Sequence, residues 1–379
     1  MKIIVSTLAL EGAVKNLCKV INPKNALPIL GDILFDVNEK AKIARLTASD
    51  AEVIMTREIG LSECEGGGKF CVEATRLKDA LSGLSEQPLT ILATTESDQR
   101  FTIQHASGET YFPLEAADEY PMPTEEEYNE TLGGVKGEWM RDAMKRSLWA
   151  TADDNLRPIM NGVDFALNDG DLDIVASDGH VLVKSQYHIK VDEKRCGSFV
   201  MPRKVAKILG DIAENDYYVD IEWNDRWGHI ELTELDITFR LIEGKYPNYN
   251  AIIPRDQPLQ AAVERTRLLN GLRKVIPFTT DNQGAKMVRL HFEGEELKMS
   301  GEDYDFSIGA TDSMSIEYEG DTIEIGVSGN RLKTILQKIG GQEVCISMQD
   351  PSHAIIIEPS EQEDGYDVLM LAMPMMLND

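Results

Sequence analysis

The sequence predicts an α+β fold of three tandem, similar domains, each an internal duplication of one helix plus an antiparallel sheet. Three observations support this prediction. Short segments recur along the chain at nearly one spacing, a helical pattern recurs at about half that spacing, and alternating strand patterns lie between the helices. The length of 379 residues also exceeds one typical core and suits two or three domains.

The clearest repeat is a ten-residue segment that aligns three times without gaps. Its copies start 128 and 127 residues apart, and each is apolar at its first, sixth and tenth positions. They are VEATRLKDAL (Val72–Leu81), VMPRKVAKIL (Val200–Leu209) and VSGNRLKTIL (Val327–Leu336). Two further sets keep a similar spacing, of 125 to 128 residues: Asp50, Asp178 and Asp303, and Pro121, Pro247 and Pro374. Three sets with nearly one period predict a threefold repeat.

Breaks between the repeats predict the domain boundaries. Residues 121–137 are acidic and lack apolar periodicity, and residues 254–258 form a shorter break. The predicted domains are residues 1–129, 130–256 and 257–379. Helical patterns begin at intervals of 62 to 66 residues, near Leu10, Ala74, Glu138, Met201, Val263 and Gly329. Strand patterns, clearest at 229–242 and 353–359, lie between them, so six half-units of one helix plus several strands are expected.

Charge is unevenly distributed between the predicted helices and the rest of the chain. With 65 acidic against 38 basic residues, the formal net charge of −27 argues against nucleic-acid binding if it is spread evenly. The six helical windows 10–24, 74–86, 138–151, 201–215, 263–274 and 329–340 hold 18 basic and 8 acidic residues. They are therefore net +10, and the remainder of the chain is −37.

Two interpretations of the basic helices remain open. Lysine and arginine are good helix formers on solvated faces, which explains any single helix. Six equivalent helices that face the same way would instead form one positive surface, which attracts phosphates without reading bases. The repeated position of the helices favours this second interpretation.

Cysteine usage and hydropathy bound the remaining function classes. The five cysteines are scattered and show no C-x-x-C spacing, so a disulfide framework or a zinc site is not expected, and neither is a cofactor. No stretch reaches the roughly 18 apolar residues of a membrane span, and the N-terminus does not resemble a signal peptide. We expect a soluble, cytoplasmic protein with no membrane partner.

Several motifs resemble one family along the whole chain. They are ALPILGD (Ala26–Asp32), RPIMNGV (Arg157–Val163), ASDGH (Ala176–His180), EGKYPNYNAIIP (Glu243–Pro254) and MPMML (Met373–Leu377). In this order they resemble the bacterial DNA polymerase III β subunits, the replicative sliding clamps. The resemblance implies the DNA clamp fold and a head-to-tail homodimer ring through which double-stranded DNA passes without sequence recognition.

The resemblance also implies a non-catalytic accessory subunit that confers processivity. It would tether the DNA polymerase III catalytic subunit and other clamp-binding replication and repair proteins. Loading would need a separate ATP-driven clamp loader complex, since the chain has no G-x-x-x-x-G-K-[ST] loop of its own. A different class, an enzyme or a repeat scaffold that binds acidic polymers in an open cleft, is the alternative.

A hydrophobic cleft for short partner peptides is implied by motif. Its residues would be Met160, Ser177, Gly179, His180, Val181, Leu182, Pro247, Ile252, Met373, Pro374, Met375, Met376 and Leu377. Better-known members of the family often have arginine where this chain has Val181, Ala251 and Met376, so a more apolar, less cationic cleft is expected. The alternative for the methionine-rich end is a last core strand; methionine also suits surfaces that accept several partners.

DNA contacts and a subunit interface are implied as well. Lys24, beside ALPILGD, and Arg157 are the first candidates for DNA, and the helices add Arg76, Arg203, Lys204, Lys207, Arg273, Lys274 and Arg331. Some of these could instead form ordinary exposed ion pairs. Candidate apolar anchors of the dimer interface are Phe112, Leu114, Ile276 and Phe278, for which the alternative is a place in the core.

Ser177, Asp178 and His180 raise the alternative of a nucleophile with an acid–base pair. Nucleophilic catalysis needs a base within hydrogen-bond reach and a group that orients it. The equivalent segment around Asp50 repeats the Ser–Asp pair without a histidine. We therefore predict a turn-capping aspartate and no catalysis.

Overall fold

The computed structural model describes residues 1–94, 99–122, 126–168, 170–189, 197–213, 218–280 and 285–377. These residues form two compact units. Unit 1 comprises Met1–Arg141 and Asp211–Leu241, and unit 2 comprises Asp142–Gly210 and Ile242–Asp379. Every strand pairing among the described residues is antiparallel, as predicted.

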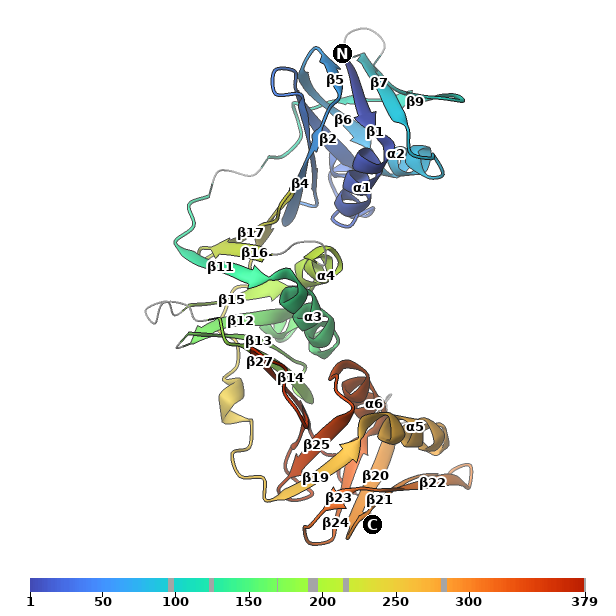
Figure 1. Cartoon of the computed structure of the whole chain (residues 1–379), viewed down its shortest axis with the longest axis vertical. Helices are drawn as coiled ribbons and strands as arrows, with labels where there is room; N and C mark the ends of the chain where they lie inside the picture. The colour runs from blue at the N-terminus through green and yellow to red at the C-terminus, as the bar shows by residue number, and fades with distance from the viewer. Residues whose placement is uncertain are drawn as a thin grey trace. The chain divides into compact units, whose positions relative to one another are not determined.

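Unit 1 holds a five-stranded sheet and a nine-stranded sheet. The order of the first is β5 (Glu63–Glu65), β1 (Lys2–Ser6), β7 (Pro88–Thr94), β8 (Arg100–His105) and β9 (Gly108–Pro113). The order of the second is β10 (Glu115–Ala116), β6 (Gly68–Glu73), β2 (Asp32–Asn38), β3 (Ile43–Ser49), β4 (Val53–Gly60), β18 (Leu235–Arg240), β17 (Trp227–Glu231), β16 (Tyr218–Trp223) and β11 (Glu130–Lys136). Helices α1 (Thr7–Leu17) and α2 (Ala74–Leu81) pack side by side, and η1 (Pro28–Gly31) is a short 3₁₀ turn (Figure 1).

Unit 2 holds a nine-stranded sheet and a four-stranded sheet. The order of the first is β15 (Gly197–Pro202), β12 (Gly162–Asn168), β13 (Asp171–Ser177), β14 (Val181–Tyr187), β27 (Tyr366–Ala372), β26 (Ile355–Pro359), β25 (Glu343–Met348), β19 (Leu259–Glu264) and β23 (Glu317–Tyr318). The order of the second is β22 (Ile308–Ser315), β21 (Glu296–Asp303), β20 (Met287–Glu293) and β24 (Ile323–Ser328). Helices α5 (Arg265–Val275) and α6 (Gly329–Lys338) pack side by side (Figure 1). Its short 3₁₀ turns are η2 (Leu148–Ala150), η3 (Pro158–Asn161), η5 (Tyr249–Ala251) and η6 (Ile276–Phe278).

The predicted helices are confirmed in number and place, counted over the described ranges. The remaining two, α3 (Gly137–Ser147) and α4 (Arg203–Ile212), each contain residues of both units. Helix α1 begins at Thr7, before the predicted Leu10, because Ser6 ends β1 and its side chain caps the helix by accepting from the Ala9 N–H. Glu264 and Ser328 cap α5 and α6 in the same way at the ends of their preceding strands.

Aromatic residues form much of the core of each unit. In unit 1 the ring centroids of Phe35 and Phe70 lie 5.1 Å apart, and Phe101 lies 5.9 Å from Phe70. In unit 2 the rings of Phe165 and Phe199 stack at 4.8 Å across β12 and β15. No helix among the described residues is both long and apolar enough to cross a membrane.

The middle third of the chain shares a sheet with each neighbouring third. In unit 1, β18 pairs with β4, from Leu235↔Arg57 to Phe239↔Val53. In unit 2, β14 pairs with β27, from Val181↔Ala372 to Tyr187↔Tyr366. The compact units therefore divide the predicted domain 130–256 between them. The boundaries at 129/130 and 256/257 stay a prediction.

Candidate functional site

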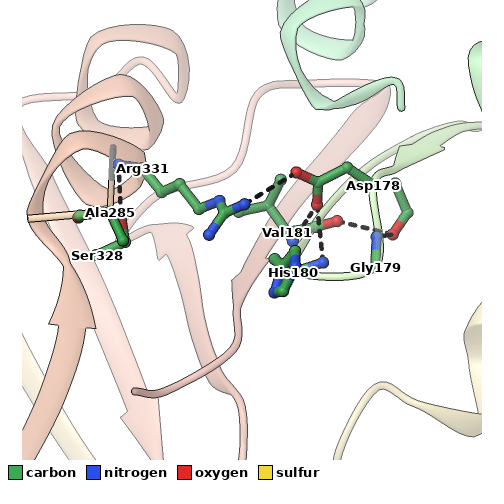
Figure 2. A network of polar contacts seen from close by, with 8 residues as sticks. Asp178, Gly179, His180, Val181, Ala285, Ser328 and Arg331 are labelled. Atoms are coloured by element: carbon green, nitrogen blue, oxygen red, sulfur yellow. Dashed lines mark hydrogen bonds and ion pairs between the residues drawn. The ribbon is translucent and has the colours of Figure 1, made fainter. Parts of the chain in front are cut away.

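Asp178 caps the turn between β13 and β14. Its Oδ1 accepts hydrogen bonds from the N–H groups of His180, at 2.7 Å, and Val181, at 2.8 Å (Figure 2). Gly179 has a φ of +87°, the left-handed conformation that glycine adopts without strain. The buried Ser177 hydroxyl donates to the Val181 carbonyl over 2.7 Å, so it is engaged with the main chain. This confirms the predicted turn-capping role of the aspartate.

The same turn occurs at the other two repeats. Asp50 Oδ1 accepts from the N–H groups two and three residues further on, at 3.0 and 2.8 Å. Asp303 Oδ1 does the same at 3.1 and 3.2 Å. The repeated aspartates are thus explained by one local geometry, an Asx-type turn.

The end of the chain runs from this turn to the edge of the four-stranded sheet. The Met373 N–H donates to the His180 carbonyl over 2.8 Å, and the Met375 N–H donates to the Gly326 carbonyl over 2.8 Å. A Cβ on Gly326 would lie 2.6 Å from the Met375 carbonyl oxygen, so glycine allows this close approach. The side chains of Met373 and Met376 are 43% and 87% exposed.

The structure confirms the core-strand interpretation for one part of the methionine-rich end; the partner surface stays a prediction for the rest. Residues up to Ala372 form β27, and Met370 is fully buried there. From Met373 onward the chain leaves the sheet and exposes apolar side chains. Asn378 and Asp379 lie outside the described residues.

A loop between β18 and β19 is hydrogen-bonded to the same turn and to the strand that precedes it. The Tyr246 hydroxyl accepts from the Ser177 N–H over 2.9 Å, and the Tyr249 hydroxyl donates to Asp173 Oδ2 over 2.9 Å. Lys184 Nζ lies 3.1 Å from the same oxygen, and the Asp173 side chain is 3% exposed. These buried polar contacts fix the loop that carries Pro247 and Ile252.

A second buried carboxyl group, that of Asp164, lies near Asp173. Burial and the nearby Asp173 charge raise the pKa of Asp164 to about 7.

The structure brings most of the predicted cleft residues to one region of unit 2. Residues 177–182 form the turn, residues 373–377 are bonded to it at His180, and the loop with Pro247 and Ile252 is bonded to it through Tyr246. Ile252, at 53% exposure, joins Met373 and Met376 as an exposed apolar side chain. Met160, Val181 and Leu182 are buried, so they can form at most the base of a cleft. We call this set of residues, which the sequence predicts to bind partner peptides, the partner cleft.

Arg331 lies at the partner cleft, although the sequence predicts a DNA contact for it. Its Nη2 lies 3.4 Å from Asp178 Oδ2, and its side chain is 33% exposed (Figure 2). Arg157 is also near the turn, because a Cβ on Gly179 would lie 3.3 Å from its Nη1, and it pairs with Asp154 at 3.0 Å. Sequence spacing gave no sign of either placement.

The other DNA candidates lie on several elements. Lys24 is exposed in the loop after α1, and Arg203 and Lys207 are exposed on α4, whose Val205, Ile208 and Leu209 are buried. That division confirms the predicted amphipathic helix. In ion pairs, Arg76 lies 2.6 Å from Glu73, and Lys274 lies 2.9 Å from Asp312. Arg267 also bonds Asp312, and these two cations lower the pKa of that carboxyl group. Lys204 is half-buried and Arg273 exposed.

Three of the four predicted interface anchors lie in the chain's own core. Phe112, Leu114 and Ile276 are 8%, 2% and 7% exposed, and the Phe112 ring lies 5.4 Å from that of Phe101. Phe278 is 41% exposed. Tyr111 was not among the predicted anchors. It is 58% exposed on β9, because neighbouring residues of a strand point to opposite faces. The alternation of a strand indicates that only one of Tyr111 and Phe112 is buried.

Two sheet edges carry exposed apolar residues. β9 ends the five-stranded sheet of unit 1, and β22 ends the four-stranded sheet of unit 2. Near β22 the side chains of Tyr304, Phe306 and Ile308 are 75%, 76% and 43% exposed. Within the described ranges, no group of three or more histidine, cysteine, aspartate or glutamate residues is arranged to hold a metal ion.

Models of one family match nearly the whole chain. The N-terminal, central and C-terminal domains of the DNA polymerase III beta subunit match residues 1–124, 134–248 and 250–375. The beta sliding clamp of Pseudomonas aeruginosa is 25% identical over 364 residues, covering 93% of this chain and 94% of the relative. That of Chlamydia muridarum is 23% identical over 381 residues and is covered completely, as is this chain.

Solved structures show the same fold. A sliding clamp from Pseudomonas aeruginosa bound to griselimycin superposes with a TM-score of 0.92 at 21% identity, covering 100% of both chains. The DNA polymerase III beta subunit from Thermotoga maritima gives a TM-score of 0.89 at 22% identity, also over 100% of both chains.

The fold and these matches define a DNA sliding clamp, a processivity factor and not an enzyme. The chain belongs to the family of DNA polymerase III beta subunits, the bacterial beta sliding clamps. The resemblance stated from the motifs is therefore confirmed.

Proposed function

We propose that two copies of this chain close head to tail into a ring around duplex DNA and tether the DNA polymerase III catalytic subunit. Membership of the sliding-clamp family over three tandem segments carries the proposal. The basic faces of the helices support it, since phosphate contacts give affinity without sequence recognition. A closed ring is held by topology, so each contact can be weak enough to allow sliding.

The sheet edges support a particular closure. An exposed edge strand presents unpaired N–H and C=O groups that can pair with another chain. In the proposed ring, β9 of one protomer pairs with β22 of its partner, which covers Tyr111 and the apolar residues near β22 together. Phe278 would join this contact. Phe112, Leu114 and Ile276 would support it from within the core.

The partner cleft is the proposed docking site for short peptides of the polymerase and of other replication and repair proteins. Its exposed Ile252, Met373 and Met376 suit apolar anchor residues, and methionine adapts to several shapes. A clamp loader complex and a cytoplasmic location are part of the same proposal.

The topology of DNA binding tests the ring. A clamp loaded on circular duplex DNA should stay bound at high salt and slide off once the DNA is cut. Release from circular and linear DNA at the same salt concentration would favour an open-cleft scaffold, the alternative raised by the sequence. Retention on linear DNA blocked at both ends is the control that the cut itself does not damage the protein.

A further inference from the structure

The ion pair between Arg331 and Asp178 is loose and asymmetric. The carboxylate is already fixed through Oδ1, which accepts the N–H groups of His180 and Val181 at 2.7 and 2.8 Å. Its other oxygen lies 3.4 Å from Arg331 Nη2, beyond the roughly 2.7–2.9 Å of a strong charge-assisted hydrogen bond. Asp178 therefore keeps its turn whether or not the arginine stays with it.

Arg331 has hydrogen-bonding capacity to spare. A guanidinium group presents five N–H donors in a planar fork that fits a carboxylate through two parallel bonds. The present pairing is a single long contact, and the side chain is 33% exposed. A better-placed carboxylate could replace Asp178 at little cost to the turn.

Backbone hydrogen bonds tie the methionine-rich end to the two elements that Arg331 joins, β24 before α6 and the turn that Asp178 caps. Met375 is bonded to Gly326 in β24, and α6 begins at Gly329, with its Ser328 cap accepting from the Arg331 N–H. Met373 is bonded to His180, in the turn that Asp178 caps. Figure 2 shows the Arg331 side chain extending from α6 to this turn. The predicted cleft residues themselves include no arginine or lysine.

We propose that Arg331 is a specificity-determining residue of the partner cleft, selecting segments that carry a carboxylate beside their apolar anchors. The incoming carboxylate takes the guanidinium in place of Asp178, while the apolar side chains cover Met373 and Met376. This inference rests on the peptide-binding function proposed above. It replaces the expectation of a less cationic cleft with a cation supplied from a different element.

Matched synthetic peptides test the proposal on the full-length protein. Each fluorescein-labelled decapeptide has two adjacent leucines in a Gly/Ser background, with Glu or Gln placed in turn at every other position. We expect Glu to bind about tenfold more tightly than Gln at one or two positions in fluorescence anisotropy. Arg331→Gln should abolish that difference and leave the affinity for the Gln peptides unchanged, which also shows that the cleft is folded.

Two further variants sharpen the test. Asp178→Asn should tighten binding of the Glu peptides, because Asn Oδ1 can still cap the turn while the competing charge is gone. Lys338→Gln removes one positive charge from the same helix and should keep the Glu preference. If the wild type binds Glu and Gln peptides equally, or if Arg331→Gln keeps the preference for Glu, the proposed role of Arg331 is wrong. The peptide-binding function of the cleft would not be affected by either result. A wild-type protein that binds none of the peptides overturns the peptide-binding function itself.

Discussion

The Tyr249 hydroxyl donates a hydrogen bond to Asp173 across 2.9 Å, joining a loop to a strand that lies 76 residues earlier in the sequence. Both side chains are buried, and Lys184 balances the carboxylate from the neighbouring strand. Because this loop also carries Pro247 and Ile252, the bond helps to fix the position of two residues of the predicted partner cleft.

Tyr249→Phe removes that bond and leaves a buried carboxylate with one partner fewer. We expect the free energy of unfolding to fall by about 1–3 kcal/mol, measured by urea denaturation. Tyr304→Phe is the matched control, since its ring is 75% exposed and its loss should be within about 0.5 kcal/mol. Equal midpoints for Tyr249→Phe and the wild type would contradict the structural role of the bond.

The buried Asp164 makes stability depend on pH near neutrality. Burial and Asp173 raise its pKa from 3.8 to about 7, so the folded protein holds a proton that the unfolded chain has already lost. The free energy of unfolding should therefore fall as the pH rises from about 4 to about 7. Asp164→Asn should flatten the part of this curve above pH 6.

A second buried carboxyl separates this effect from a general one. Burial, Glu115 and Glu73 raise the pKa of Asp32, in unit 1, to about 6. Asp32→Asn should flatten the curve at lower pH and leave the slope between about pH 6 and 7 in place. An unchanged slope in Asp164→Asn, followed by chemical denaturation at half-unit pH steps, would refute the assignment.

Deleting residues 373–379 should abolish binding of the polymerase while leaving the proposed ring closed. The segment leaves the sheet after Ala372, so its loss spares β27 and the core. Binding is measured by surface plasmon resonance and ring integrity by solution mass. Undiminished polymerase affinity would show that the partner cleft does not include this segment.

Tyr111→Asp places a charge on the sheet edge proposed to pair with β22. We expect the solution mass at micromolar concentration to shift from two chains toward one. Tyr218→Asp is the control, because Tyr218 is similarly exposed, at 61%, on a different strand. A wild-type solution mass that corresponds to one chain would contradict the proposed ring.

Lys207→Gln should weaken binding to short linear duplexes slightly and equally for all sequences. Losing one phosphate contact should reduce the slope of log affinity against log salt concentration by about 1. Lys69→Gln is the control. It removes an exposed lysine of β6 that forms an ion pair with Asp36, and it should leave the slope unchanged. A similar loss in both variants would mean that total charge, and not the α4 surface, controls binding.

Local patterns in the sequence predict the local parts of this structure. Apolar periodicity locates the six helices found in the described ranges. The spacing of Asp50, Asp178 and Asp303 marks turns that form from hydrogen bonds to groups two and three residues away. Motif resemblance then identifies the family and names the residues of the predicted partner cleft, most of which the structure brings to one region of unit 2.

Local sequence patterns do not predict contacts between segments that are far apart in the chain. The pairing of β18 with β4 joins strands about 180 residues apart, and no local pattern specifies which edge meets which. Helical spacing puts Arg331 on a polar face, but its partner Asp178 is 153 residues away. Phe112 and Tyr111 are adjacent aromatics, and only the sheet decides which of the two is buried.

The two nine-stranded sheets have a consequence for how this chain can be taken apart. If residues 130–256 were expressed alone, β18 would lose its pairing with β4, and β14 would lose its pairing with β27. Both strands would then be exposed sheet edges, which promote aggregation. The piece that repeats in the sequence is therefore not a piece that can stand alone. Unfolding of the first or last third by heat, or its cleavage by a protease, should destabilise the middle third, because main-chain hydrogen bonds join them in one sheet.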